Sequence, residues 1–467
     1  MNKNILFFTV PFNGHFNVIQ ELARQCSVNN NVTLVICSWE TIDLPKIDHT
    51  LTFKLFKSQN IPSSSPIEFT FIRITDIIDE VINYCNQPID YIIYDFFTLE
   101  GYIISELFRI PAICSIPAIF GLEFNYNYFN KGINYNQTYI TSIENKYDVK
   151  IFNQLSLVSD GFLIPGDFNL LWVPKSFYNN DLPVNLTNII HLYNDVQKLD
   201  NKENLVYVSF GTVVTGNLWN NNHNVREYLY LLYKSIGDLG VFNPHLKFII
   251  SIPHKAPYYI NKLNNLPSNV EMVSFIDQKT ILKRTRLFIT HGGGNSVREA
   301  IMTKTPMLVL PFFGDQYDSA MRITKLGIGC SMISKKDIDT TKSEFNLDNL
   351  NNFNKIFNLV WNNLSQFEFN YQYLLNNDNG VSVDNFRLPL NIKWKEGDLL
   401  YGTNIDRLKF AKLLKREDYY QIKPFSTLAN INNGSLPRLI DQYHDVINNN
   451  SAYNEEIKSN TEYSQWL

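Results

Sequence analysis

Long hydrophobic runs are missing from the sequence. No apolar stretch approaches the roughly 20 residues that a membrane-spanning helix needs. The N-terminal MNKNILFFTVPFNGH has only a short apolar segment, residues 5–11, and lacks a small-residue cleavage site, so we interpret it as a first β-strand and not as a signal peptide. We therefore expect a cytoplasmic protein without a membrane span.

Cysteine is scarce as well. The chain has five, an odd number, and their spacing is not that of a metal site. The five are Cys26, Cys37, Cys85, Cys114 and Cys330, and most of them lie in apolar stretches. This pattern predicts reduced residues of the protein core, as expected in the cytosol.

Charge is modest. Charged residues make up 18% of the chain and the net charge is −4, so we expect no general attraction to nucleic acid or to an anionic membrane. Hydrophobic residues reach 45% and aromatic residues 14%, which is typical of a globular protein with apolar cores and favours an apolar pocket. The length of 467 residues exceeds what one hydrophobic core supports and fits two α/β domains.

Strand-like and helix-like segments alternate along most of the chain. Short apolar runs separated by amphipathic segments predict parallel sheets covered by helices, hence an α/β fold class. We predict a first Rossmann-like domain over residues 1–195, a polar linker over 196–203 and a second Rossmann-like domain over 204–440. The pattern is irregular at about 365–425, which we leave unassigned, and residues 441–467 are interpreted as a helix end and a polar tail. The simplest architecture has the two domains facing each other across a cleft, with ligands at the carboxyl ends of strands.

A glycine-rich turn interrupts RLFITHGGGNSVREA, which is otherwise a strand followed by a helix start. Glycines remove Cβ atoms that would block main-chain N–H groups, and a helix N-terminus attracts anions, so this turn predicts a phosphate site. Asn295 and Ser296 add side-chain donors, His291 can donate from the strand end, and Glu299 is placed to reach a ribose hydroxyl. A plain helix cap by Asn295 or Ser296 is the alternative.

The next strand, PMLVLPFFGDQ, ends in a second polar pair, Asp315 and Gln316, at the same edge of the predicted sheet. Together, HGGGNSVREAIMTKTPMLVLPFFGDQ resembles the donor-binding box of the UDP-sugar-dependent glycosyltransferases of the GT-B fold, a family that includes plant secondary-product and animal glucuronosyl enzymes. SFGT at 209–212 is similar to the first strand-turn of that family's C-terminal domain. The resemblance implies donor-binding roles for Thr212, Phe275, Gln278, His291, Gly293, Gly294, Asn295, Ser296, Glu299, Asp315 and Gln316.

The start of this box departs from the family pattern. Phe275-Ile276-Asp277-Gln278 replaces the usual Trp-x-Pro-Gln, and the distance from Phe275 to His291 is two residues shorter than expected. Phe275 still offers a ring on which uracil can stack, with a smaller face than tryptophan. A donor nucleotide other than a uridine nucleotide therefore stays open.

A histidine follows the first predicted strand in PFNGHFNVIQELA. A helix that begins there favours the neutral imidazole, which is the form that a general base needs. Alone, such a Gly-His pair is more often a structural cap or a chance occurrence. GHFNVIQELA is, however, similar to the Gly-His-x-Asn-Pro start of the same family, with Val18 where proline is frequent, and this resemblance implies that His15 is the catalytic base.

Asp95 is the single charge at the end of the buried strand YIIYDFF. It can cap the helix that follows, and the resemblance implies that it also orients His15 and balances its charge. The implied reaction is an inverting, metal-independent transfer of a sugar from a UDP-sugar to a small hydroxylated acceptor, phenolic or lipid-like, without a cofactor and without a nucleic-acid partner.

The remaining predictions concern substrates and alternatives. The resemblance implies glucose as the donor sugar, because Gln316 is in keeping with glucose in that family. The aromatic segment 119–140 is a candidate acceptor pocket, although such a segment is more often core or loop. A nucleotide-sugar-binding protein without turnover, or a GT-B-fold epimerase or cell-wall-type transferase, stays open as an alternative.

Overall fold

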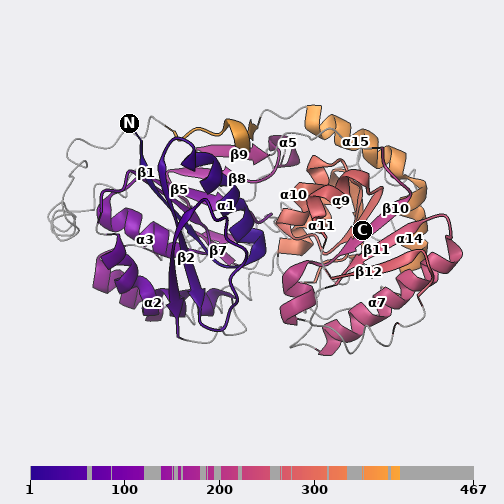
Figure 1. Ribbon diagram of the computed structural model, residues 1–467, viewed down its shortest axis with the longest axis horizontal. Helices are drawn as coiled ribbons and strands as arrows, with labels where there is room; N and C mark the ends of the chain where they lie inside the picture. The colour runs from indigo at the N-terminus through magenta and orange to yellow at the C-terminus, as the bar shows by residue number, and fades with distance from the viewer. Residues whose placement is uncertain are drawn as a thin grey trace, which may run out of the picture.

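The computed structural model describes residues 2–389 except 60–65, 86, 120–137, 150, 152–155, 159–160, 179–185, 187, 194–200, 219–222, 253–262, 264–265, 275, 313–314, 334–349, 351 and 377–379. The chain forms two α/β lobes that lie side by side (Figure 1). This arrangement confirms the predicted fold class. All five cysteines are buried, as predicted.

The first lobe is built on a parallel sheet that has eight strands in the described residues, in the order β16-β9-β8-β5-β4-β1-β2-β3. Its elements are β1 (Asn4–Thr9), α1 (Asn13–Ser27), β2 (Asn31–Trp39), β3 (Thr52–Ser58), α2 (Pro66–Tyr84), β4 (Tyr91–Asp95), α3 (Leu99–Phe108), β5 (Ala112–Ile116), β8 (Phe168–Leu171), α5 (Lys175–Tyr178) and β9 (Ile189–Tyr193). A separate antiparallel pair consists of β6 (Ser156–Val158) and β7 (Gly161–Leu163).

The second lobe is built on a parallel sheet with the order β12-β11-β10-β13-β14-β15 among the described residues. Its elements are β10 (Leu205–Ser209), the π-helix η2 (Val213–Leu218), α7 (His223–Phe242), β11 (Lys247–Ser251), β12 (Val270–Val273), α9 (Gln278–Arg284), β13 (Leu287–Thr290), α10 (Gly294–Met302), β14 (Met307–Val309), α11 (Asp315–Lys325), β15 (Gly329–Ser331), α14 (Phe353–Asn362) and α15 (Leu364–Asn376).

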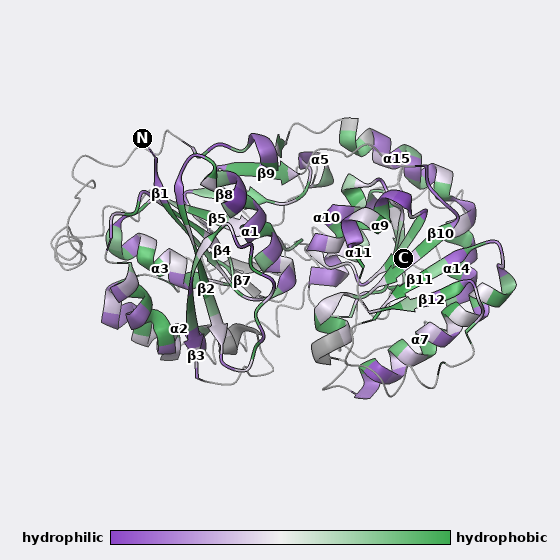
Figure 2. Ribbon diagram, viewed as in Figure 1, coloured by the Kyte–Doolittle hydropathy of each residue, from purple (hydrophilic) through white to green (hydrophobic). Residues whose placement is uncertain are grey.

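The central strands are mostly apolar because helices cover both faces of each sheet. In β1, Ile5 and Phe7 pack into one buried cluster while Leu6 and Phe8 pack into another, so successive side chains enter the cores on opposite faces. The hydropathy colouring shows the same layering, with apolar strands inside and polar residues on the outer sides of helices such as α7 (Figure 2). These apolar runs line the buried clusters on both faces of each sheet.

The chain returns to the first lobe after α15. The short strand β16 (Val381–Ser382) pairs with β9, and the 3₁₀ helix η4 (Val383–Asn385) follows it. Val383 and Phe386 are buried in the same cluster as Ile5 and Phe7. The predicted extent of the second domain, residues 204–440, is corrected here: residues 381–388 lie with the first sheet because their apolar side chains complete its core.

Other predicted boundaries are tested only in part. β9 and β10 belong to different sheets, so the chain crosses between the lobes within residues 194–204, of which 194–200 lie outside the described residues. The unassigned segment 365–425 contains most of α15 and all of β16, and the predicted segment 441–467 lies outside the described residues. No described helix is long and apolar enough to cross a membrane. The cytoplasmic location stays a prediction.

Candidate active site

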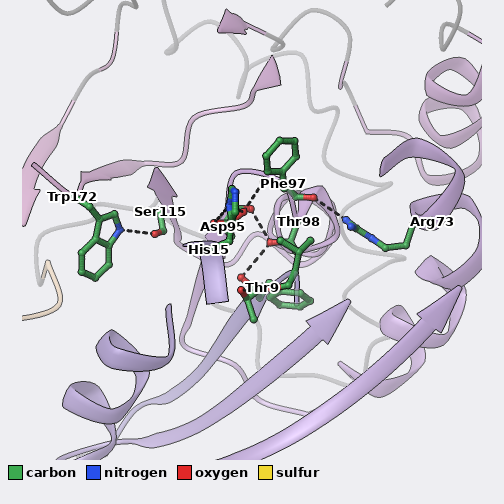
Figure 3. Close-up of polar contacts among 10 residues, drawn as sticks. Thr9, His15, Arg73, Asp95, Phe97, Thr98, Ser115 and Trp172 are labelled. Carbon is green, nitrogen blue, oxygen red and sulfur yellow. Dashed lines mark hydrogen bonds and ion pairs between the residues drawn. The ribbon is translucent and has the colours of Figure 1, made fainter. Parts of the chain in front are cut away.

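His15 and Asp95 meet at the carboxyl edge of the first sheet. β1 and β4 are adjacent and parallel, so the first turn of α1, which follows β1, lies beside the end of β4. His15 Nδ1 is 2.9 Å from Asp95 Oδ2 and 3.0 Å from Oδ1 (Figure 3). A carboxylate only accepts hydrogen bonds, so Nδ1 carries the proton and Nε2 is left as the basic nitrogen.

The main chain that follows Asp95 fixes its carboxylate. The Phe97 N–H donates to Asp95 Oδ1 at 2.9 Å, and the Thr98 hydroxyl donates to the Asp95 carbonyl at 2.7 Å. The N-cap of α3 is Thr98, and no side chain caps that helix, so the interpretation of Asp95 as its cap is wrong. The Asp95 side chain is fully buried and bonds to His15, as the resemblance implied.

Aromatic rings surround the His15 imidazole. Its ring centroid is 6.3 Å from that of Phe12, 5.5 Å from Phe96 and 5.0 Å from Phe97. The His15 side chain is still 18% exposed, so the imidazole is reachable from solvent. No sequence motif gives these phenylalanines a role, although all three lie within three residues of His15 or Asp95 in the sequence.

The glycine-rich turn lies between β13 and α10, as predicted. Gly292 has a φ of +84°, in the region that favours glycine. A Cβ atom on Gly293 would lie 2.5 Å from His291 Nε2, and one on Gly211, whose φ is +69°, would lie 2.7 Å from the same atom. The His291 ring therefore fits between two bare stretches of main chain, which is a reason for these glycines that the sequence did not indicate.

His291 is electrically neutral near pH 7. Burial lowers the pKa of His291 from its ordinary 6.5 to about 4, and a hydrogen bond with the Ser209 main chain offsets part of this shift. The Thr290 hydroxyl lies 3.4 Å from His291 Nδ1. A neutral imidazole has one N–H to donate, which suits it to contact an anion without holding a permanent charge in a buried place.

Acid should destabilise the folded chain through His291. The unfolded histidine titrates near 6.5 and the folded one near 4, so the unfolded state binds more protons between these values and the free energy of unfolding falls as pH falls through them. We expect the urea midpoint to fall more between pH 6.5 and pH 4 for the wild type than for His291→Gln. Equal falls in the two proteins would contradict this assignment. Saturating UDP should reduce the wild-type fall, because a neighbouring diphosphate favours the imidazolium.

Four predicted donor residues form one hydrogen-bonded network on α9 and α10. Gln278 Nε2 donates to Ser296 Oγ at 3.1 Å and to Glu299 Oε2 at 2.8 Å, and Asn295 Nδ2 donates to Glu299 Oε1 at 3.3 Å. Burial raises the pKa of Glu299, and Arg298 and the Gln278 bond oppose that rise. Asn295 Oδ1 is buried with no hydrogen-bond partner among the described residues. The ribose role of Glu299 stays a prediction, and it requires this carboxylate to share or exchange its present partners.

Asp315, Gln316 and Thr212, which were also predicted to bind the donor, follow strands of the same sheet. Gln316 is buried in the first turn of α11, next to Asp315, and its Oε1 accepts the Phe312 N–H at 2.9 Å. Thr212 is exposed beyond β10, and Asn13 Nδ2 lies 3.4 Å from its hydroxyl. Phe275 lies outside the described residues, as do residues 120–137 of the predicted acceptor segment 119–140.

The two lobes touch at the site. Arg298 of α10 donates to Glu21 of α1 at 3.1 Å, and its guanidinium lies 5.0 Å from the centre of the Trp172 ring. A Cβ on Gly294 would clash with the Pro117 carbonyl of the first lobe, so glycine is needed there for the close approach. The helix that carries His15 thus faces the helix that begins at the glycine-rich turn (Figure 1). The sequence gives no signal that Arg298 and Glu21 pair, because the two residues lie on different lobes.

Known proteins share this arrangement and this segment. Residues 251–350 match the family model described as UDP-glucoronosyl and UDP-glucosyl transferase. The chain is 25% identical over 293 residues to the uncharacterized UDP-glucosyltransferase YojK of Bacillus subtilis, covering 56% of this chain and 64% of that protein. It is 23% identical over 356 residues to the NDP-glycosyltransferase YjiC of Bacillus licheniformis, covering 70% of this chain and 84% of that protein.

Solved structures agree on the fold. The glycotransferase of kitacinnamycin superposes with a TM-score of 0.56 at 17% identity, over 80% of this chain and 96% of that one. The calicheamicin glycosyltransferase CalG4 gives a TM-score of 0.54 at 16% identity, over 80% of this chain and 94% of that one. The chain is a relative of the UDP-sugar glycosyltransferases and has their GT-B fold.

The family model covers only part of the predicted site of this GT-B chain. The donor residues from Phe275 to Gln316 lie inside the matched segment, whereas the donor residue Thr212 and the catalytic pair His15 and Asp95 lie outside it. The alignment with YojK spans 64% of that relative, just under two thirds of its length. What this particular chain transfers, and to which acceptor, is therefore a matter for proposal.

Proposed function

We propose that this GT-B chain transfers a sugar from a UDP-sugar to a hydroxyl group of a small apolar or aromatic acceptor, with inversion at the anomeric carbon. The observation that carries the proposal is the His15–Asp95 pair, which lies on the lobe that faces the glycine-rich turn. A protein that only binds nucleotide-sugars has no need of a basic imidazole nitrogen oriented by a buried carboxylate.

The reaction is a direct displacement. His15 Nε2 takes the proton of the acceptor hydroxyl, the oxygen bonds to the anomeric carbon, and the bond from that carbon to the diphosphate oxygen breaks, so UDP departs. Asp95 keeps the proton on Nδ1 and balances the positive charge that the imidazole gains. The attack comes from the face opposite the leaving diphosphate, which inverts the configuration.

The leaving diphosphate gains negative charge as the bond breaks. Unpaired N–H groups at the start of α10, the Ser296 hydroxyl and the neutral His291 are the groups of this chain that can stabilise it. Each well-placed donor in such a site contributes about 3 to 4 kcal/mol to the transition state. Asn295 Oδ1, which lacks a partner among the described residues, can accept a hydrogen bond from a donor hydroxyl.

The side chains around the proposed site indicate which acceptor and which donor sugar would fit. Phe12 and Phe97 are half-buried beside His15, so a flat apolar acceptor can pack on them while its hydroxyl reaches the base. We infer glucose as the donor sugar from Gln316, in keeping with the name of the relative YojK as a UDP-glucosyltransferase. Galactose transfer in preference to glucose would overturn this part.

Product analysis tests the proposed function. The protein is incubated with a panel of UDP-sugars and dTDP-sugars and a mixed library of phenols, flavonoids and sterols, and the products are identified by mass spectrometry. We expect a hexose added to at least one apolar hydroxylated compound, and NMR of that product should show the inverted anomer. UDP binding without any transfer product would favour a nucleotide-sugar-binding protein instead.

Transfer should need no divalent metal. Two carboxylates of the proposed site already have other partners: Glu299 bonds to Gln278 and Asn295, and Asp95 bonds to His15. We therefore expect unchanged initial rates after exhaustive dialysis against EDTA, with added Mg²⁺ or Mn²⁺ giving no increase. A rate that falls with EDTA and returns with the metal would contradict the metal-independent mechanism.

A further inference from the structure

A buried guanidinium lies directly behind the His15–Asp95 pair. Arg73 of α2 is fully buried; its Nε donates to Glu100 Oε1 at 2.7 Å and its Nη2 donates to Glu100 Oε2 at 2.9 Å. The same Nη2 donates to the Phe97 carbonyl at 2.8 Å (Figure 3). Arg73 therefore joins α2, the first turn of α3 and the turn that follows β4.

The turn that Arg73 holds is the one that holds Asp95. Phe97 offers its carbonyl to Arg73 on one side and its N–H to Asp95 Oδ1 on the other, at 2.9 Å, and its ring lies 5.0 Å from the His15 ring. Arg73 also lies 4.8 Å from the centre of the Trp39 ring, and Trp39 stacks on Phe12 beside His15. Phe97 directly, and Phe12 through Trp39, are thus both linked to the Arg73 guanidinium.

Folding stability does not account for this arrangement. A buried ion pair loses hydration that its mutual attraction seldom exceeds, and apolar residues of similar volume often stabilise a fold as well or better. Arg73 Nη1 finds no hydrogen-bond partner in the part of the chain that the structure describes, which adds a desolvation cost. Such costs are typical of functional sites, where geometry is selected over stability.

We propose that Arg73 is a positioning residue for the reaction: it fixes the Phe97 turn so that Asp95 stays aligned with His15. This inference rests on the proposed function. The groups that face the guanidinium are Glu100 of α3, Asp95 of β4 and the Cys37 thiol of β2, with His15 beyond Asp95. Burial opposes the Arg73 charge, but these partners outweigh burial and place the pKa of the guanidinium above its ordinary value, so Arg73 is a permanent cation behind the pair.

Arg73→Lys tests the positioning role. Lysine keeps the charge but lacks the planar fork that bonds Glu100 and Phe97 together. We expect kcat to fall about 10- to 100-fold, as when a catalytic group is displaced by about 1 Å, while the Kd for UDP stays within about 2-fold. Arg24→Lys on the exposed face of α1 is the matched control and should leave kcat unchanged. A folded Arg73→Lys with wild-type kcat would overturn the proposal.

Glu100→Gln separates geometry from charge. The glutamine carbonyl introduced by this change can still accept from Arg73, so the Phe97 carbonyl stays bonded, but the cation behind Asp95 is no longer balanced. An uncompensated cation disfavours the imidazolium, so the acid limb of the kcat–pH profile should move to lower pH, with kcat on the plateau within about 3-fold of wild type. A plateau kcat that falls in the folded Glu100→Gln as far as in Arg73→Lys, although the Phe97 carbonyl stays bonded, would contradict the proposal. A wild-type chain without any transfer would instead contradict the proposed function.

Discussion

His15→Ala is expected to lower kcat for sugar transfer by about 100- to 10,000-fold, the range that general-base catalysis contributes. The substitution removes the nitrogen that takes the acceptor proton, and no described side chain other than His15 bonds to the Asp95 carboxylate. The proposed donor site lies on the other lobe, so UDP should bind with unchanged affinity. Transfer is measured by mass spectrometry of the product and UDP binding by calorimetry.

Asp95→Asn provides a second, sharper form of the same prediction. An asparagine amide can donate to Nδ1, which places the imidazole proton on Nε2 and leaves no base toward the acceptor. A loss comparable to that of His15→Ala is expected. His49→Ala is the matched control for His15→Ala, because it makes the same substitution at a histidine that is 96% exposed. Retention of transfer by both His15→Ala and Asp95→Asn would exclude this pair as the catalytic machinery.

Gly211→Ala is expected to weaken UDP binding by about 10-fold or more, equivalent to about 1.4 kcal/mol. Its φ of +69° disfavours any side chain, and the new Cβ would lie 2.7 Å from His291 Nε2. The imidazole must therefore shift away from the diphosphate position. Gly293→Ala should act in the same way, because its Cβ would lie 2.5 Å from the same atom.

Gly14→Ala serves as the control for these glycine variants. Its Cβ would meet nothing within 4 Å, so UDP affinity should be unchanged. Thermal unfolding of each variant, with and without UDP, distinguishes a lost ligand contact from a misfolded lobe. A wild-type Kd for UDP in both Gly211→Ala and Gly293→Ala would show that His291 does not contact the donor.

Much of the fold could be predicted because its signals are local. Continuous apolar strands such as NILFFT and YIIYD alternate with amphipathic helices, and parallel strands bring their carboxyl ends to one edge. His15 and Asp95, 80 residues apart in sequence, meet for that reason. β16 could not be predicted in the same way, because a two-residue strand carries no periodic pattern. Its position depends on the burial of Val383 and Phe386 in the apolar core of the first lobe.

The residues of the proposed site could be named from the sequence, but the contacts that hold them in place could not. Sequence motifs mark His291, Asn295 and Ser296, whereas the hydrogen bonds from Gln278 to Ser296 and Glu299 depend on how α9 packs beside α10. The Arg73–Glu100 pair joins residues on two different helices, 27 positions apart, and a buried ion pair has no sequence signature. Contacts made by tertiary packing carry no local signal, so the structure alone reveals them.

The central claim is that a diphosphate binds at the start of α10, opposite the imidazole of the first lobe. A crystal structure of the protein soaked with UDP tests it most directly. We predict diphosphate oxygens within hydrogen-bond distance of the main-chain N–H groups of residues 293–296 and of the His291 ring, with His15 Nε2 facing the side on which the sugar would lie. UDP bound away from this turn, with His291 and Ser296 making no contact to it, would contradict the account.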